Sequence, residues 1–364
     1  MSEKNYANRR DFLRGLLALP MAGVAMSLGG CGGPAPTQVA PTVRADTPTQ
    51  APTQAPTQVL TKAPTQASKQ AASAPTEAPT PTAAQPRNPA SAGDTYLAVV
   101  RGQTPGPAEL TRRAIAALGG IERWVKRGAD VIIKPNICNA YNGPEYASTT
   151  NPEVVAAIVA LCVGAGAKRV RVMDFPFGGT AQNAYRASGI AQAVEAAGGR
   201  MELMNSLNYQ VVKIPNALAL RQTEVYADLL KADVVINVPI AKHHSLATLT
   251  LGLKNLMGTV KDRRTIHASG LHESIVDLAT VIKPQLTVID ATRILMANGP
   301  TGGNLNDVKR MDTVIASADV VSADAYATTL FGKTGADIAY IALAAKLGLG
   351  RMDLKSIKIE EINA

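Results

Sequence analysis

The sequence predicts an α/β fold in which helices cover both faces of a mainly parallel sheet, after a disordered N-terminal tether. Residues 94–364 alternate short runs of β-branched residues with longer amphipathic stretches, whereas residues 1–93 consist mostly of Ala, Pro, Thr and Gln. Strands that are apolar almost throughout are typical of a sheet buried on both faces. Only the second region has enough large apolar side chains to form a core, so we expect one α/β domain over 94–364.

The first 31 residues have the organisation of an export signal. Arg9 and Arg10 precede an apolar stretch, 16–28, which is shorter than the ~20 residues that a bilayer span needs and ends close to Cys31. The paired arginines resemble a twin-arginine signal, and LGGC resembles a bacterial lipobox. We therefore expect export by the Tat machinery and an extracytoplasmic chain anchored to a membrane through lipidated Cys31. An ordinary Sec signal with an accidental cysteine is the alternative.

Residues 32–93 are predicted to form a disordered linker. The tetrapeptide APTQ occurs at 35–38, 51–54, 55–58 and 63–66. Frequent Pro blocks helices and sheet ladders, and Thr, Gln and Ala offer little apolar surface to bury. This segment therefore separates the predicted anchor from the α/β domain.

Eight runs of apolar and β-branched residues in the domain are predicted to be strands. The run at 209–214 alternates, and we expect it to form an edge hairpin with the segment before it. The predicted strands are 95–100, 130–134, 169–174, 209–214, 233–238, 286–290, 313–317 and 356–362.

The amphipathic stretches between these runs predict seven helices. One start is well marked, because Asn151 is a favourable N-cap and Pro152 suits the first helical position; the amides there could also hold an anion. The segment 248–258 fits both a strand and a helix and is left unassigned. The predicted helices are 107–126, 152–165, 181–197, 223–231, 270–282, 320–331 and 335–347.

The formal net charge of +9 does not indicate a nucleic-acid partner. Residues 1–93 hold eight Lys or Arg and four Asp or Glu, which leaves 29 basic and 24 acidic residues in the domain. The sequence has no long basic run, and four Phe and one Trp offer little for base stacking. We therefore expect no nucleic-acid binding.

Polar residues follow several of the predicted strands. In open parallel sheets, ligands bind outside the carboxyl ends of the strands, so these side chains are candidates for one shared crevice. Polar turns after strands are the structural alternative. The candidates are Lys134, Asn136, Asp174, Lys242, His243, His244, Asp290 and the loop 298–303, which contains Gly299.

All four histidines lie within 241–272. Adjacent residues of an extended segment point in opposite directions, so His243 and His244 are not expected to face one site together. His267 and His272 are five residues apart and do not share a helix face cleanly. Neither pair matches a compact zinc pattern, although one His from each pair with a strand-end aspartate remains an alternative metal site.

Basic residues crowd the same segment, which contains Lys242, Lys254, Lys261, Arg263 and Arg264. Their positive field suits a carboxylate or a phosphate, beside a histidine that can move a proton near pH 7. A solvated basic loop is the alternative for the last three. Lys254 differs because apolar residues surround it in GLKNLMG, so its charge needs a partner or a ligand.

Two cysteines remain after Cys31. Cys162 lies in an apolar helix and is expected in the core, whereas Cys138 follows KPNI near the proposed crevice. A disulfide between them is left open for an exported protein. Two thiolates cannot hold an ordinary iron–sulfur cluster, so none is expected within this chain.

The motifs IIKPN, TNPEVV, AKHHSLATLTLGLKNLMG, TVID and NGPTGG, in this order, resemble the family of domain of unknown function 362. The resemblance covers residues 96–349. Members are often exported and often carry ferredoxin-like cysteine clusters, which implies redox or metal association, but this chain has no such cluster. The family pattern matches Lys134, Pro135, Asn136, Asn151, Pro152, Lys242, His243, Lys254, Asn255, Gly258, His267, Asp290, Gly299 and Pro300.

These observations favour an extracytoplasmic enzyme that acts on a small anion. Lys134, Lys242 and Lys254 would hold negative charge, with Asn136, Asn151, Asp174, Asn255 and Gly299 as further ligand-binding residues. His243 or His267 would act as general acid or base, and Asp290 or Asp174 would orient a histidine or bind a cation. A non-catalytic receptor for an anion or metal is one alternative. A metal-dependent redox protein with an unidentified redox or transport partner is another, and a divalent metal is left open as a cofactor.

Overall fold

The computed structural model describes residues 96–364. The predicted signal peptide, the lipidation site at Cys31 and the linker lie outside the described residues. Within 96–364, every helix is too short or too polar to cross a bilayer.

Ten strands form one mixed sheet in which most neighbours are parallel, in the order β12-β1-β11-β10-β7-β2-β3-β4. β11 runs antiparallel to both of its neighbours, and β8 joins β10 while the short β9 pairs with β8. These strands are β1 Leu97–Arg101, β2 Asp130–Pro135, β3 Arg169–Val172, β4 Arg200–Met201, β7 Val234–Val238, β8 Ile240–His244, β9 Thr248–Thr250, β10 Leu286–Leu295, β11 Val308–Ser317 and β12 Ile359–Asn363.

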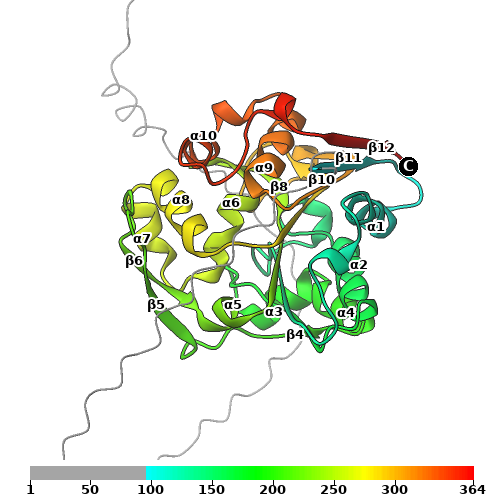
Figure 1. The fold of residues 1–364 in the computed structure, drawn as a ribbon, viewed down its shortest axis with the longest axis horizontal. Coiled ribbons are helices and arrows are strands. Elements are labelled where there is room, and N and C mark those ends of the chain that lie inside the picture. The colour runs from blue at the N-terminus through cyan, green and yellow to red at the C-terminus, as the bar shows by residue number, and fades with distance from the viewer. Residues whose placement is uncertain (1–95) are drawn as a thin grey trace, which may run out of the picture. The chain divides into compact units, whose positions relative to one another are not determined.

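Helices cover both faces of the sheet (Figure 1), as the apolar strands predict. Along β1, Leu97 and Val99 belong to the core beneath α8, α9 and α10, while Ala98 and Val100 belong to the core beneath α1, α2 and α4. The helices are α1 Pro107–Ala117, α2 Pro152–Gly164, α3 Ala181–Ala187, α4 Ile190–Ala196, α5 Ala227–Lys231, α6 Gly252–Asn255, α7 Arg263–Ala268, α8 Leu271–Val281, α9 Val320–Thr328 and α10 Ala339–Lys346.

Four local predictions are corrected by the structure. The helix predicted over 107–126 ends at Ala117, before two glycines with positive φ. The segment 209–214 pairs with the residues after it, because β5 (Tyr209–Lys213) and β6 (Gln222–Tyr226) form a separate two-stranded sheet. The predicted helix 223–231 is therefore wrong over its first half, and only α5 is helical. The predicted helix 181–197 is two helices, because Gly189 adopts a left-handed φ of 71° between α3 and α4.

The unassigned segment 248–258 contains both kinds of structure. Its first three residues form β9 and return along β8, and α6 follows directly. Asp324 accepts hydrogen bonds from the first two amides of α6, Gly252 N at 2.6 Å and Leu253 N at 2.9 Å. The segment is therefore a strand followed by a helix, which accounts for both periodicities in its sequence.

β7 and β8 continue one another, with only Pro239 between them. β7 pairs with β2 as far as Val238, which lies opposite Pro135 at the end of β2. β8 runs on beyond that level, beside the second half of β10, and turns back as β9. We call this difference in strand length the sheet step. It leaves the carboxyl ends of β2 and β3 beside a wall formed by β8.

Candidate functional site

A cavity of about 630 Å³ lies at the sheet step, and we call it the strand-end cavity. Its lining comes from the ends of β2 and β3, from β8 and the turn after it, from the α6–α7 region and from the 300–301 loop. The charged lining residues are five cations and one carboxylate, so the cavity attracts anions. They are Lys134, Lys242, Lys254, Arg263, Arg264 and Asp174.

Lys134 and Asp174 form a buried ion pair at the base of this cavity. Lys134 Nζ lies 2.8 Å from Asp174 Oδ1 and donates to Asn255 Oδ1 at 2.9 Å. Asp174 Oδ2 also accepts from the backbone N–H of Ile137 at 2.6 Å. Burial lowers the pKa of Lys134, and the adjacent Asp174 opposes that shift. The carboxylate therefore balances the charge of this one lysine.

Lys242 joins β8 to two loops. Its Nζ donates to Asn136 Oδ1 at 2.9 Å and to the carbonyl oxygens of Ser148 at 2.6 Å and Pro300 at 3.1 Å. Asn136 Nδ2 in turn donates to Asn255 Oδ1 at 2.8 Å. Three acceptors satisfy the three donors of the ammonium group. Lys242 therefore holds the wall in place and contributes positive charge that these neutral acceptors leave unbalanced.

Lys254 has a different environment. It is only 8 % exposed, and its hydrogen-bond partner among the described residues is the Met257 thioether, with Nζ 3.6 Å from Sδ. A thioether is a weak acceptor. Burial, followed by the charge of Lys242, lowers the pKa of Lys254 to about 7. Near neutral pH this side chain is therefore a mixture of a free amine and a poorly compensated ammonium.

His244 lines the strand-end cavity as a neutral hydrogen-bond donor. Its Nδ1 accepts from the backbone N–H groups of Leu246 at 3.1 Å and Ala247 at 3.2 Å, so Nε2 carries the ring proton. Burial, followed by the charge of Lys254, lowers the pKa of His244 to about 3. The ring is consequently uncharged throughout the physiological pH range.

His267 lines the same cavity with the opposite tautomer. Its Nδ1 lies 2.8 Å from the carbonyl oxygen of Arg263, which can only accept, so Nδ1 carries a proton. In the neutral ring, Nε2 then has a free lone pair. His267 can accept a proton where His244 can donate a hydrogen bond.

Arg263 connects α7 to the loop after β3. Its guanidinium donates to the carbonyl oxygens of Phe175 at 2.8 Å and Pro176 at 3.1 Å, and lies 4.7 Å from the centre of the Phe175 ring. Burial lowers the pKa of Arg263 below its usual value. This contact closes one side of the strand-end cavity with a cation.

Asn151 and Asp290 lie together outside the lining of this cavity. Asp290 is fully buried and accepts from Asn151 N at 2.7 Å and from Thr292 N and Oγ1 at 2.9 and 2.7 Å. Asn151 Oδ1 caps α2 by accepting from Glu153 N at 3.0 Å. Burial raises the pKa of Asp290. The expectation that Asp290 orients a histidine is corrected: it fastens the start of α2 to β10.

The expectation that His243 faces the crevice is also corrected. Side chains alternate along β8, so Lys242 and His244 face the strand-end cavity while His243 points away. His243 Nδ1 accepts from Gly299 N at 3.1 Å. A Cβ on Gly299 would collide with the His243 carbonyl, so glycine permits this close approach. Gly299 itself lies next to Pro300, which does line the cavity.

Of the predicted site residues, the structure brings seven to the strand-end cavity and places His243, Asn151, Asp290 and Gly299 elsewhere. Three further residues line the cavity without a predicted role: His244, Phe175 and Phe177. Period-two alternation from Lys242 would have indicated His244. The seven are Lys134, Asn136, Asp174, Lys242, Lys254, Asn255 and His267.

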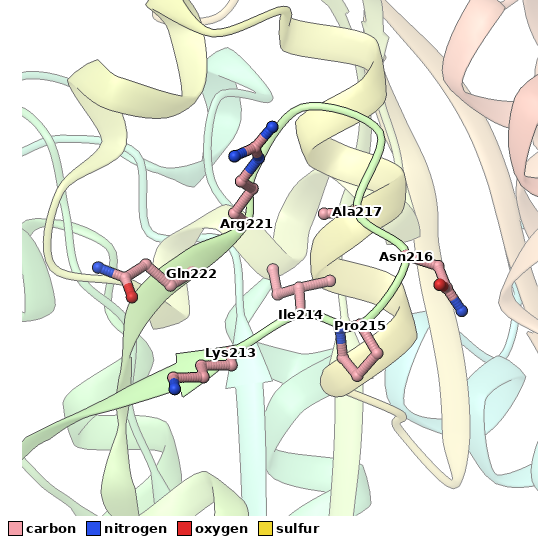
Figure 2. A pocket seen from close by; sticks show the side chains of 7 residues that line it. All are labelled: Lys213, Ile214, Pro215, Asn216, Ala217, Arg221 and Gln222. Carbon is pink, nitrogen blue, oxygen red and sulfur yellow. The ribbon is translucent and has the colours of Figure 1, made fainter.

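A second hollow, of about 560 Å³, lies at the turn between β5 and β6 (Figure 2). Residues 213–222 of that single hairpin supply its whole lining. Asp277 anchors the same turn by accepting from the backbone N–H groups of Leu218, Ala219 and Leu220 at 2.7 to 2.9 Å. The hollow is therefore a feature of one turn, whereas the strand-end cavity gathers residues that are far apart in sequence.

Potential metal ligands do not gather in the described part of the chain. Within 96–364, no three His, Cys, Asp or Glu residues come together in a group that could hold a metal ion. Cys138 lines the strand-end cavity and Cys162 lies in the core, and both are free thiols. Burial raises the pKa of the Cys162 thiol to about 12. The disulfide left open by the sequence is thus not formed in this structure.

Comparisons with known proteins identify a family and distant structural neighbours. A family model for a domain of unknown function (DUF362) matches residues 131–329. A thylakoid-associated protein of Synechocystis sp. is 31% identical over an alignment of 252 residues that covers 65% of this chain and 74% of that protein. The lactate racemase apoprotein of Thermoanaerobacterium thermosaccharolyticum aligns with a TM-score of 0.38 and 13% identity, over 60% of this chain and 53% of its own. A structural-genomics protein from Thermotoga maritima aligns with a TM-score of 0.43 and 14% identity, over 64% and 60%. The chain thus spans less than two thirds of each of these two structures.

Proposed function

Because this chain belongs to the domain of unknown function 362 family, whose name assigns no reaction, we propose its function from the strand-end cavity. The cavity binds a small anion, such as a carboxylate or a phosphate, and moves a proton to or from it. The observation that carries this proposal is Lys254, a buried cation that lines the cavity and has, within residues 96–364, only a thioether as hydrogen-bond partner. An anionic ligand supplies the compensation that such a cation lacks.

The two imidazoles support the proton-transfer part of the proposal. His244 offers an Nε2–H donor to an anionic oxygen, and His267 offers a free Nε2 as a base. Lys254, with a pKa of about 7, gains or loses a proton easily at neutral pH. A donor, a base and a cation around one ligand suit proton transfer at a carbon beside a carboxylate.

Anion binding is tested by calorimetry with acetate, phosphate and sulfate. We expect Lys254→Met to weaken binding about 10- to 150-fold, because a hydrogen bond to a charged group contributes ~1.5–3 kcal/mol. The matched control is Lys261→Met, which removes an exposed lysine that pairs with Glu224 at 3.0 Å outside the cavity. Equal affinities of the two variants would contradict the proposal.

Proton transfer is tested separately from binding. Carboxylates that bind are incubated with the protein in D₂O, and exchange of the hydrogen next to the carboxylate is followed by NMR. We expect exchange that His267→Ala abolishes while binding remains. Binding without exchange for every carboxylate would favour the non-catalytic receptor.

We also propose that the domain acts outside the cytoplasm, tethered to a membrane by lipidated Cys31. The support is the order of paired arginines, a short apolar stretch and LGGC in the sequence. Metabolic labelling with a palmitate analogue tests this in a bacterial host. Label should enter the wild type but not Cys31→Ala, and Arg9→Lys with Arg10→Lys should block export.

A further inference from the structure

We infer, building on the proposed anion site, that Lys254 is a nucleophile that forms an imine with an anionic carbonyl compound, a 2-oxo acid being the simplest. The three lysines of the cavity differ in their partners. Lys134 Nζ pairs with the Asp174 carboxylate, and three oxygen acceptors hold Lys242. Lys254 Nζ faces neither a carboxylate nor a carbonyl among the described residues, only the Met257 sulfur. It is the cavity lysine whose lone pair can become available.

The residues around Lys254 favour its neutral amine form, while the strand-end cavity keeps its positive charge. Lys254 is buried beside the charges of Lys242, Arg263 and Lys134, which disfavour a further positive charge. Those same charges attract a carboxylate or phosphate group on the ligand. The cavity therefore has separate places for the two functional groups of one molecule: cations for its anionic group and an amine for its carbonyl carbon.

The step is balanced without an oxidant or reductant. The Lys254 nitrogen attacks the carbonyl carbon, and the C–O π bond breaks as the new C–N bond forms. The nitrogen loses its two hydrogens, which leave with the former carbonyl oxygen as water, and a C=N bond remains. His244 Nε2–H can donate to the carbonyl oxygen, and His267 Nε2 can carry a proton from nitrogen to the departing oxygen.

The full chain is incubated with pyruvate or glyoxylate, reduced with borohydride, and analysed by intact mass and peptide mapping. We expect one reduced adduct per chain, on Lys254, with a yield that rises with pH through 7. Acetate, which has no ketone or aldehyde, should give none. Lys254→Arg should lose the adduct, because a guanidinium is not nucleophilic at this pH. Lys261→Arg, which leaves the cavity lining unchanged, should keep both the adduct and phosphate binding.

The results of these experiments distinguish failure of imine formation from failure of anion binding. Phosphate binding without an adduct, or adducts spread over exposed lysines and unchanged in Lys254→Arg, overturns the imine and leaves the anion site standing. If the wild type does not bind phosphate, both the imine and the proposed anion site are overturned. Thermal unfolding of Lys254→Arg establishes that its lost adduct does not come from a lost fold.

Discussion

Three lysines line the strand-end cavity, and their partners give them three roles. Lys134 is neutralised by Asp174, and Lys242 is held by three neutral oxygens. Lys254 contacts a thioether and has a pKa of about 7. The partner of each side chain, rather than its type, therefore decides which lysine is available for a ligand.

Anion affinity should depend on pH through Lys254. The ammonium form binds the anion, so affinity should be constant well below pH 7 and fall as pH rises through 7, by up to about tenfold per unit. Sulfate is the suitable probe because its charge does not change in this range. Calorimetry at pH 6 to 9 measures the effect, and Lys254→Arg should give a flatter curve. A wild-type profile that does not change across this range would contradict the role of Lys254.

Lys254→Met should stabilise the unliganded protein. The pKa of Lys254 is about 7 in the folded state and 10.5 ordinarily, so the unfolded chain binds more protons between these values. The free energy of unfolding of the wild type therefore rises from pH 7 to 10.5. Below pH 7 it is lowered by the full cost of burying the Lys254 ammonium. We expect a gain of ~1–3 kcal/mol at pH 6 that shrinks by pH 10, measured by urea unfolding. A destabilised variant at pH 6 would oppose this account.

At the scale of elements, short segments position the site. α6 has four residues and is held at its start by the buried carboxyl of Asp324. The turn that follows brings Gly258 against Lys134 and Asp174. An isolated helix of this length is not stable in water, so these tertiary contacts maintain it.

Gly258→Ala should damage the strand-end cavity. A Cβ there would collide with Asp174 Oδ1 and lie 2.7 Å from Lys134 Nζ, so the buried ion pair must shift. We expect a loss of ~1–3 kcal/mol in stability and weaker sulfate binding. Gly164→Ala is the control, because its Cβ would meet nothing within 4 Å and its site ends α2. If the two variants have equal stability and equal sulfate affinity, the ion pair of Lys134 and Asp174 accommodates the added Cβ without loss, and the prediction is wrong.

At the scale of the whole molecule, one sheet supports two cores. Strand residues alternate between the face beneath α1, α2 and α4 and the face beneath α8, α9 and α10. The backbone ladder that both cores share joins them, so we expect residues 96–364 to unfold as one unit.

Leu278→Ala tests this cooperativity. Leu278 is fully buried in the core beneath α8, and the chain's single tryptophan, Trp124, packs against the opposite core. Truncation should cost ~2–5 kcal/mol. The unfolding midpoints from Trp124 fluorescence and from far-ultraviolet circular dichroism should shift together. A fluorescence midpoint that stays in place would mean that the two cores unfold independently.

The sheet and the polar strand ends could be predicted from the sequence because both follow from local patterns. Apolar runs located eight strands, and the residues after them included Lys134, Asp174 and Lys242. The side of β8 that faces the cavity depends on tertiary contacts, so His243 was chosen where His244 lies. The contact of Arg263 with Phe175 joins residues 88 apart, and no local pattern reports it.

The sheet step ties the depth of the strand-end cavity to one hairpin. That depth depends on how far β8 and β9 extend beyond β2, and Ala241 and Leu249 anchor the hairpin in the core beneath α8, α9 and α10. Two additional residues in each strand of that hairpin would raise the wall by roughly 7 Å and keep the same side chains facing the cavity. The length of this hairpin therefore sets how long a molecule the cavity can enclose.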